Sequence, residues 1–99
     1  MEERAPISEV GDNPAKGRFE MASGDGVAFV EYTRAGDRIV LTHTEVPQAL
    51  SGQGVGSKLV RGTLDAVRAE GLKVVPRCGF VAAYVERHPE YRAMVADEG

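Results

Sequence analysis

Apolar residues along the chain follow two different periods, and the change of period separates strands from helices. Between residues 18 and 46 they form short runs rich in β-branched and aromatic side chains, which is typical of strands. We predict strands over residues 18–21, 27–34 and 38–46, joined by tight turns at 23–26 and 35–37, where Asp and Gly accept a positive φ. The polar residues 1–17 are expected to form a loose lead-in and a turn.

From residue 54 to residue 70 the apolar period becomes that of a helix. One face carries Val55, Leu59, Val60, Thr63, Leu64 and Val67, and the other carries Lys58, Arg61, Asp65 and Arg68. Gly71 is expected to end this helix in the left-handed conformation. A short strand at 72–75 should stop at Pro76, and a second helix is expected at 80–88. Pro89 should break it before a final helical stretch that reaches about residue 96.

This order predicts an α/β fold with a mixed sheet. Residues 38–75 form a strand, a crossover helix and a strand, which should be parallel and right-handed, whereas the preceding hairpins are antiparallel. The chain has 99 residues, enough for one domain, which we place at 8–99 after a flexible terminus at 1–7.

Composition narrows the function classes. The net charge is −3, and the twelve Lys and Arg residues are scattered, which argues against nucleic-acid binding. No apolar run approaches the roughly 20 residues of a membrane span, and the first residues do not resemble a signal peptide. One cysteine forms no internal disulfide, so the chain needs no oxidising compartment and we expect a cytoplasmic protein. We expect it to be a monomer or a weak dimer.

A glycine-rich turn, Gly52-Gln53-Gly54-Val55-Gly56, joins the third strand to the first helix. Such a turn directs backbone N–H groups into one concavity, to which the helix dipole adds positive potential, so it suits a phosphate. Ser57 and Lys58 follow in the order opposite to that of a P-loop, and the spacing GxGxG differs from the dinucleotide fingerprint. The spacing therefore indicates an anion site, unless the glycines only pack the helix against the sheet.

This turn resembles the coenzyme A pyrophosphate loop of the GNAT acetyltransferase superfamily, (Gln/Arg)-x-x-Gly-x-(Gly/Ala). Stretches at 43–47, 71–78 and 83–91 also resemble the shortest single-domain members, so the resemblance covers about residues 8–95. This chain differs from the superfamily pattern at Ser51, where most members have Gln or Arg. Its N-terminal part is also shorter than that of a typical member.

The resemblance implies that acetyl-coenzyme A is the co-substrate. Its pantetheine arm would enter between two splayed parallel strands, beside Glu45-Val46 and Val74-Val75. Ten residues are implied as its binding residues: Glu45, Val46, Gly52, Gln53, Gly54, Val55, Gly56, Ser57, Lys58 and Tyr84. Tyr84 could reprotonate the coenzyme A thiolate or simply pack in the core.

Two routes of acetyl transfer are open. An amine can attack directly, with His43 or Glu45 as base, or Cys78 can take the acetyl group first. Cys78 precedes a helix whose dipole lowers a thiol pKa, although a lone cysteine commonly just fills the core. Because strand side chains alternate, Ile39, Leu41, His43 and Glu45 should share one face, and a buried structural role for His43 is the rival interpretation.

The leading hypothesis is thus an N-acetyltransferase acting on an unidentified amine. The alternatives are a non-catalytic module that binds coenzyme A or acyl-coenzyme A, and an interaction domain whose glycine turn binds nothing. The two histidines and the single cysteine lack the spacing of a metal site.

Overall fold

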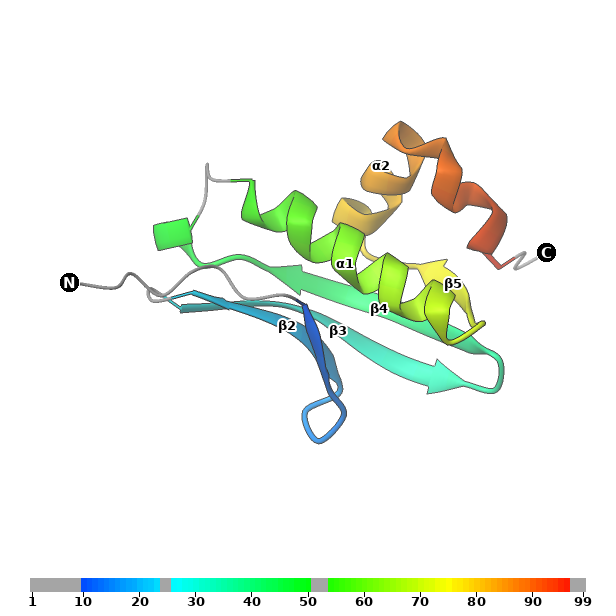
Figure 1. The fold of residues 1–99 in the computed structure, drawn as a ribbon, viewed down its shortest axis with the longest axis horizontal. Helices are drawn as coiled ribbons and strands as arrows, with labels where there is room; N and C mark the ends of the chain where they lie inside the picture. The colour runs from blue at the N-terminus through cyan, green and yellow to red at the C-terminus, as the bar shows by residue number, and fades with distance from the viewer. Residues whose placement is uncertain (1–9, 24–25, 51–53, 97–99) are drawn as a thin grey trace.

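Five strands form one mixed sheet whose spatial order repeats their order in the chain (Figure 1). The computed structural model describes residues 10–23, 26–50 and 54–96. The elements are β1 (Gly11–Asn13), β2 (Arg18–Ser23), β3 (Gly26–Ala35), β4 (Arg38–Glu45), the 3₁₀ helix η1 (Gln48–Leu50), α1 (Val55–Ala69), β5 (Lys73–Pro76), α2 (Gly79–Arg87) and the 3₁₀ helix η2 (Pro89–Met94). Strands β1 to β4 are antiparallel and β5 is parallel to β4, which confirms the predicted mixed sheet.

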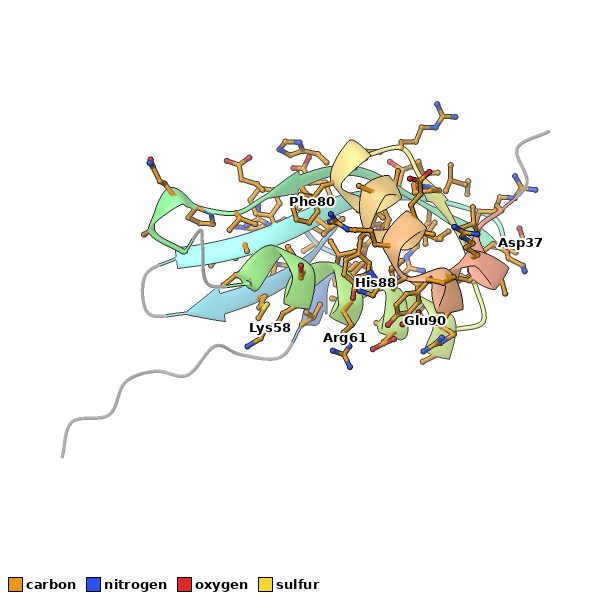
Figure 2. The ribbon with its side chains drawn as sticks, turned by 90° about the horizontal axis from the view of Figure 1, so that it is seen from above. Asp37, Lys58, Arg61, Phe80, His88 and Glu90 are labelled. Carbon is orange, nitrogen blue, oxygen red and sulfur yellow. The ribbon has the colours of Figure 1, made fainter. Side chains whose placement is uncertain are left out.

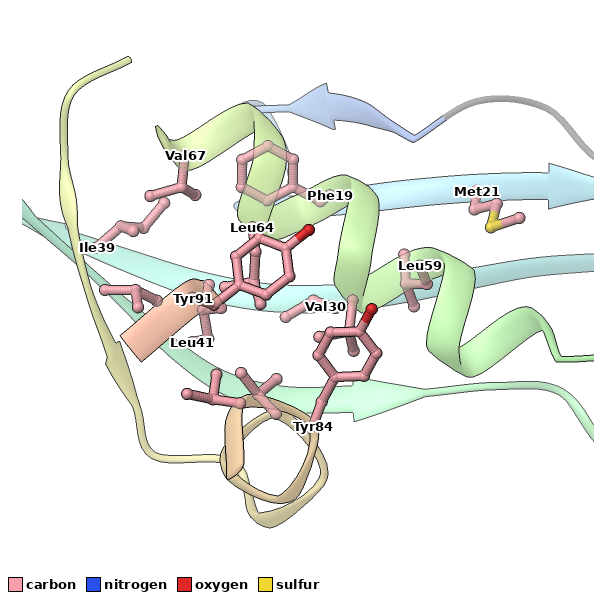
Figure 3. Close-up of a cluster of buried hydrophobic side chains, with 14 of the residues drawn as sticks. Phe19, Met21, Val30, Ile39, Leu41, Leu59, Leu64, Val67, Tyr84 and Tyr91 are labelled. Atoms are coloured by element: carbon pink, nitrogen blue, oxygen red, sulfur yellow. The ribbon is translucent and has the colours of Figure 1, made fainter. Parts of the chain in front are cut away.

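Helices α1 and α2 lie on the same face of the sheet and contact each other (Figure 1). Side chains from that face of the strands and from both helices form the core, which Figure 3 shows in close-up. The fully buried members with the largest side chains are Phe19, Ile39, Leu41, Leu59 and Leu64. The opposite face of the sheet carries Phe29, whose ring lies 4.1 Å beneath the guanidinium of Arg18.

The first helix follows its apolar period closely. All six side chains of the predicted face are buried, and the four charged residues of the other face are exposed. Gly71 follows the C-cap residue of the helix, Glu70, and its φ of +75° is the left-handed conformation expected there. Helix packing here is therefore determined by the local sequence pattern.

The C-terminal elements are held to α1 and to β5 by polar contacts. The Tyr91 hydroxyl donates to Asp65 Oδ1 at 2.7 Å, which ties η2 to α1. The Ala96 N–H donates to the Val74 carbonyl at 2.8 Å, so the chain returns to the edge of β5. As predicted, α2 ends just before Pro89, although the last helical stretch is a 3₁₀ helix that ends at Met94.

One strand was not expected. Gly11–Asn13 was predicted to belong to a loose lead-in, but it pairs with Arg18–Glu20 as β1, and only 14–17 form the turn. Polar contacts support it, because Asp12 accepts a hydrogen bond of 2.6 Å from the Tyr32 hydroxyl on β3. A hydrophobic pattern carries no trace of such contacts. The expected boundary between residues 7 and 8 stays a prediction, since it lies outside the described residues.

Candidate functional site

Strands β4 and β5 stay paired over only half of β4. Their ladder runs from Arg38 opposite Lys73 to Leu41 opposite Pro76, and the Cys78 N–H then donates to the Leu41 carbonyl at 3.0 Å. Beyond this point β4 continues to Glu45 along β3, whereas the chain after β5 turns into α2. The two segments therefore part beyond Pro76, and the region where the end of β4 and the start of α2 diverge is called the gap below. We expected it beside Val74 and Val75, but both are still paired with β4.

A β-bulge in β4 decides which side chains face this gap from the helix side. Glu31 pairs with His43 and Tyr32 with Leu41, so Thr42 is an extra residue in β4. Its hydroxyl donates to the Glu31 carbonyl at 3.2 Å. The bulge reverses the alternation of side chains that follows it. Thr44, opposite the buried Val30, therefore lies on the helix face of the sheet.

His43 and Glu45 consequently lie on the other face from Ile39 and Leu41. The expectation that these four residues share one face is wrong, because the bulge interrupts the period of two. His43 Nε2 lies 2.9 Å from Glu45 Oε1, and their side chains are 54% and 57% exposed. The rival interpretation of His43 as a buried structural residue is therefore also wrong. The structure brings these two candidates together, and it separates them from Cys78 by the thickness of the sheet.

Cys78 lies on the helix face, at the N-cap of α2. It is partly buried against the core, and its thiol donates a hydrogen bond to Thr44 Oγ1 at 3.3 Å. Burial by itself raises the pKa of this thiol. The Thr44 hydroxyl and the backbone N–H groups of Val81, Phe80 and Thr44 outweigh that effect and leave the pKa below its ordinary value. The neutral thiol makes no cap hydrogen bond, so the helix N–H groups act mainly on the thiolate.

The glycine turn is described from Gly54 onward, and the predicted ligands Gly52 and Gln53 lie outside the described residues. Gly54 is the N-cap of α1, with a φ of +72° that favours glycine. The helix begins with the Lys58 N–H donating to the Gly54 carbonyl at 3.1 Å, so the preceding N–H groups have no helical acceptor. The first turn of α1, described in full, carries no acidic residue. These features fit a phosphate.

The side chains around this helix start differ in their access to solvent. Ser57 and Lys58 are exposed, and Figure 2 shows Lys58 extending from the first half of α1. Val55 is 2% exposed and belongs to the core, so only its backbone is available to a ligand. Val46 is partly buried against the core.

Tyr84 is a core residue. It is 4% exposed and its ring stacks on that of His88 with a centroid distance of 3.9 Å. Burial raises the pKa of Tyr84 above its usual range. Of the two readings of this tyrosine, the structure confirms core packing, and its role toward a cofactor stays a prediction.

The sequence interpretation did not single out Thr44 or Phe80. Thr44 is brought to Cys78 by a bulge that no apolar pattern reveals. Phe80 could have been noticed as a large aromatic residue two positions after Cys78, and it is 45% exposed. In Figure 2 it lies between α2 and the first half of α1.

Other surface features lie apart from this region. A shallow hollow of about 440 Å³ is formed by the β1–β2 hairpin and includes no predicted site residue. Among residues 10–23, 26–50 and 54–96, no group of three or more His, Cys, Asp or Glu side chains could hold a metal ion. In the same ranges no helix is long and apolar enough to cross a membrane.

Comparison with known proteins identifies the family. The sequence model described as GCN5-related N-acetyl-transferase matches residues 18–94, which include β2 to η2 and the whole of the gap. The chain belongs to this family. The predicted resemblance to the GNAT superfamily is thereby confirmed.

Relatives and a solved structure agree with this assignment. Protein NATD1 of Gallus gallus and of Homo sapiens is each 41% identical over 63 residues, 63% of this chain, and that of Danio rerio is 34% identical over 67 residues. The matched region spans only 56–61% of these relatives' length. The solution structure of a GCN5-like putative N-acetyltransferase from Staphylococcus aureus superposes with a TM-score of 0.68, over 92% of this chain and 90% of that one, at 24% identity. It confirms the fold.

Proposed function

We propose that this protein is an acetyl-coenzyme A-dependent N-acetyltransferase that passes the acetyl group to an amine through Cys78. Family membership supports the reaction class. The observation that carries the proposal is the contact between Cys78 and Thr44 at the point where β4 and β5 part, where the thiol pKa is lowered.

Binding rests on the start of α1. Gly54 and the N–H groups that follow it would hold the pyrophosphate, and Lys58 would add positive charge. From there the pantetheine arm would run into the gap beyond Pro76, which would bring the thioester to the helix start that carries Cys78.

The chemistry then has two steps. The Cys78 thiolate attacks the acetyl carbonyl carbon, and the carbon–sulfur bond to coenzyme A breaks. The coenzyme A thiolate leaves and takes up the proton that Cys78 lost on ionisation. An unprotonated amine next attacks the acetyl carbon, a carbon–nitrogen bond forms, and the carbon–sulfur bond to Cys78 breaks. The proton released by the amine restores the Cys78 thiol. The N–H groups at the start of α2 stabilise the anionic sulfur in both steps.

The pair His43–Glu45 belongs to the competing route, in which the amine attacks the thioester directly. The pair lies at the same end of β4 but on the opposite face of the sheet, which neither α1 nor α2 covers (Figure 1) and which is called the open face below. A base there would serve an amine that approaches from that face. This route needs no acyl-enzyme, and the two routes are therefore distinguishable by covalent labelling.

Binding is tested by thermal unfolding with acetyl-coenzyme A. At a hundredfold excess over Kd, a ligand that binds only the native state adds about 2.7 kcal/mol, a shift of roughly 10–20 °C for a domain of this size. Gly54→Val should abolish the shift. Gly36→Val is the matched control, because Gly36 has a similar φ of +65° in the β3–β4 turn, far along the chain from α1. If acetyl-coenzyme A raises the melting temperature of Gly54→Val as much as that of the control, the glycine turn is not the pyrophosphate site.

Turnover is tested by coenzyme A release in the presence of a panel of amines. Amine-dependent release supports the transferase. The contrary result is that acetyl-coenzyme A stabilises the protein, but no coenzyme A is released with any amine and no acetyl group is found on the protein. That result would identify the protein as the binding module instead.

A further inference from the structure

The aromatic ring of Phe80 is a surface feature that the fold alone does not explain. Among the described residues, the exposed large hydrophobic side chains are Phe80, at 45%, and Val27, at 38%. Burying a side chain of this size is worth roughly 1.5–3 kcal/mol, so a phenylalanine left in water forgoes much of that free energy. Val27 lies on β3, whereas Phe80 lies in the first turn of α2.

The end of the Phe80 ring lies against Gly56 in the first turn of α1. A Cβ atom added at Gly56 would come within 2.7 Å of Phe80 Cζ and 3.4 Å of Cε1 and Cε2. At Gly54, in contrast, an added Cβ would meet nothing within 4 Å. The two glycines therefore serve different purposes. Gly54 supplies a left-handed backbone, and Gly56 leaves room for the ring.

This contact connects the two halves of the proposed site. Phe80 follows Cys78 by two residues, and Gly56 follows Gly54 by two residues. A ligand with its phosphates at the start of α1 and its thioester at Cys78 has to pass from one helix start to the other. Phe80 lies between these two helix starts, since it belongs to the first turn of α2 and its ring lies against the first turn of α1 (Figure 2).

The connecting part of such a ligand is partly apolar. The pantetheine arm carries two methyl groups on one carbon and several methylene groups between its amides. An aromatic ring that is half exposed before binding can cover these apolar groups.

We propose that Phe80 is a specificity-determining residue that packs on the pantetheine arm and makes the site select ligands that carry this arm over the nucleotide part of coenzyme A alone. This inference rests on the proposed function, because it assumes that acetyl-coenzyme A binds between α1 and α2. Phe80 acts by contact with the arm, and Gly56 keeps the ring in position.

The test compares two ligands on three proteins by calorimetric titration. The ligands are acetyl-coenzyme A and 3′-phosphoadenosine 5′-diphosphate, which keeps the pyrophosphate and the 3′-phosphate of coenzyme A but lacks the arm. The proteins are the unmodified chain, Phe80→Ala, and Val27→Ala as the matched control at the other exposed apolar side chain. Circular dichroism verifies that each variant is folded.

Phe80→Ala should weaken the binding of acetyl-coenzyme A about tenfold, a loss of about 1.4 kcal/mol, and leave the Kd of 3′-phosphoadenosine 5′-diphosphate unchanged within about twofold. Val27→Ala should change neither. Equal weakening of both ligands, or no weakening of either, would overturn the role of Phe80 while leaving acetyl-coenzyme A binding intact. An unmodified protein that does not bind acetyl-coenzyme A would overturn the proposed function, and this inference with it.

A double-mutant cycle gives a second readout that does not depend on truncating the ring alone. Gly56→Ala should weaken the binding of acetyl-coenzyme A by displacing the ring, and in the Phe80→Ala background the same change should cost less, because only a direct effect on the glycine turn remains. Additive losses in the double variant would mean that the two residues act independently, which contradicts the proposal.

Discussion

The two faces of the sheet at the end of β4 carry the two sets of candidate catalytic groups, and their surroundings differ. On the helix face, Thr44 contacts the partly buried Cys78, and the start of α2 lowers the pKa of the thiol. On the open face, His43 and Glu45 form an ion pair at 2.9 Å when the histidine is protonated, with more than half of each side chain exposed.

The difference shows how one extra residue sorts chemistry between two faces. Without the bulge at Thr42, His43 and Glu45 would continue the face of Ile39 and Leu41, and Thr44 would point away from Cys78. With the bulge, the Thr44 hydroxyl contacts the Cys78 thiol in a partly buried position, where hydrogen bonds to an anion are stronger than in water. The exposed pair His43–Glu45 is screened by water and contributes little to the free energy of unfolding. This difference supports the proposal that the nucleophile lies on the helix face.

The largest effect separates the two faces directly. Cys78→Ala should lower amine acetylation on the order of a hundredfold or more, because the acyl-enzyme is no longer formed. His43→Ala should lower it less than about tenfold, because His43 lies on the other face of the sheet and takes no part in the proposed route through Cys78. Coenzyme A release at saturating amine measures both. The reverse order of effects would transfer the chemistry to the open face.

The next effect concerns the pH dependence of the thiol. Thr44→Val removes a hydroxyl that favours the thiolate, so the pKa of Cys78 should rise. Alkylation by iodoacetamide should then be several-fold slower near neutral pH, with its profile displaced to higher pH. Above both pKa values the two proteins should react equally fast. Thr33→Val is the control, because Thr33 is an exposed threonine on β3 that pairs with Val40, away from the bulge. An unchanged profile in Thr44→Val would mean that Thr44 does not assist ionisation.

A smaller effect tests whether the helix face can be destabilised without losing its chemistry. Burial, and then the hydrogen bond to Asp65, raise the pKa of Tyr91 to about 12. Because an unfolded tyrosine titrates near pH 10, the folded state holds this proton more tightly. The associated stability is complete below about pH 10 and is lost as the pH rises to about 12.

Tyr91→Phe should therefore reduce the fall in stability over that alkaline range, and at neutral pH it should cost about 1 kcal/mol, or roughly 4–8 °C in Tm. Denaturant unfolding at several pH values measures this. The reactivity of Cys78 should stay the same. A variant that alters that reactivity would mean that η2, rather than Thr44 and α2, sets the thiol environment.

The smallest effect belongs to the open face. Glu45→Gln should change the free energy of unfolding by less than about 1 kcal/mol, because exposed ion pairs contribute little. It should also leave acetyl transfer to Cys78 unaffected. A large loss of stability would show that the pair is structural, and a large loss of acylation would show that the faces are coupled.

Much of the fold was predictable because α1 follows one apolar period without interruption and β3 is rich in β-branched and aromatic residues. The buried face of α1 agrees residue by residue with its pattern, and the family that the glycine turn suggested is confirmed. Strand β1 was missed, since the hydrogen bond from Tyr32 to Asp12 depends on residues far apart in the sequence.

The site was less predictable than the fold, for a physical reason. The period of two fails wherever a strand gains a residue, and nothing in the run from Arg38 to Glu45 indicates that Thr42 is the extra one. Cys78 was recognised from its place before a helix. Its partner Thr44 and the ring of Phe80 emerge only when β4 and the two helices are brought together.

The central claim is that Cys78 receives the acetyl group, and peptide mass spectrometry after incubation with acetyl-coenzyme A alone tests it most directly. The account predicts one acetyl group on Cys78, removed by hydroxylamine as a thioester is, retained in His43→Ala and absent in Cys78→Ala. An unlabelled Cys78 in a protein that still acetylates an amine, together with loss of that activity in His43→Ala, would contradict it.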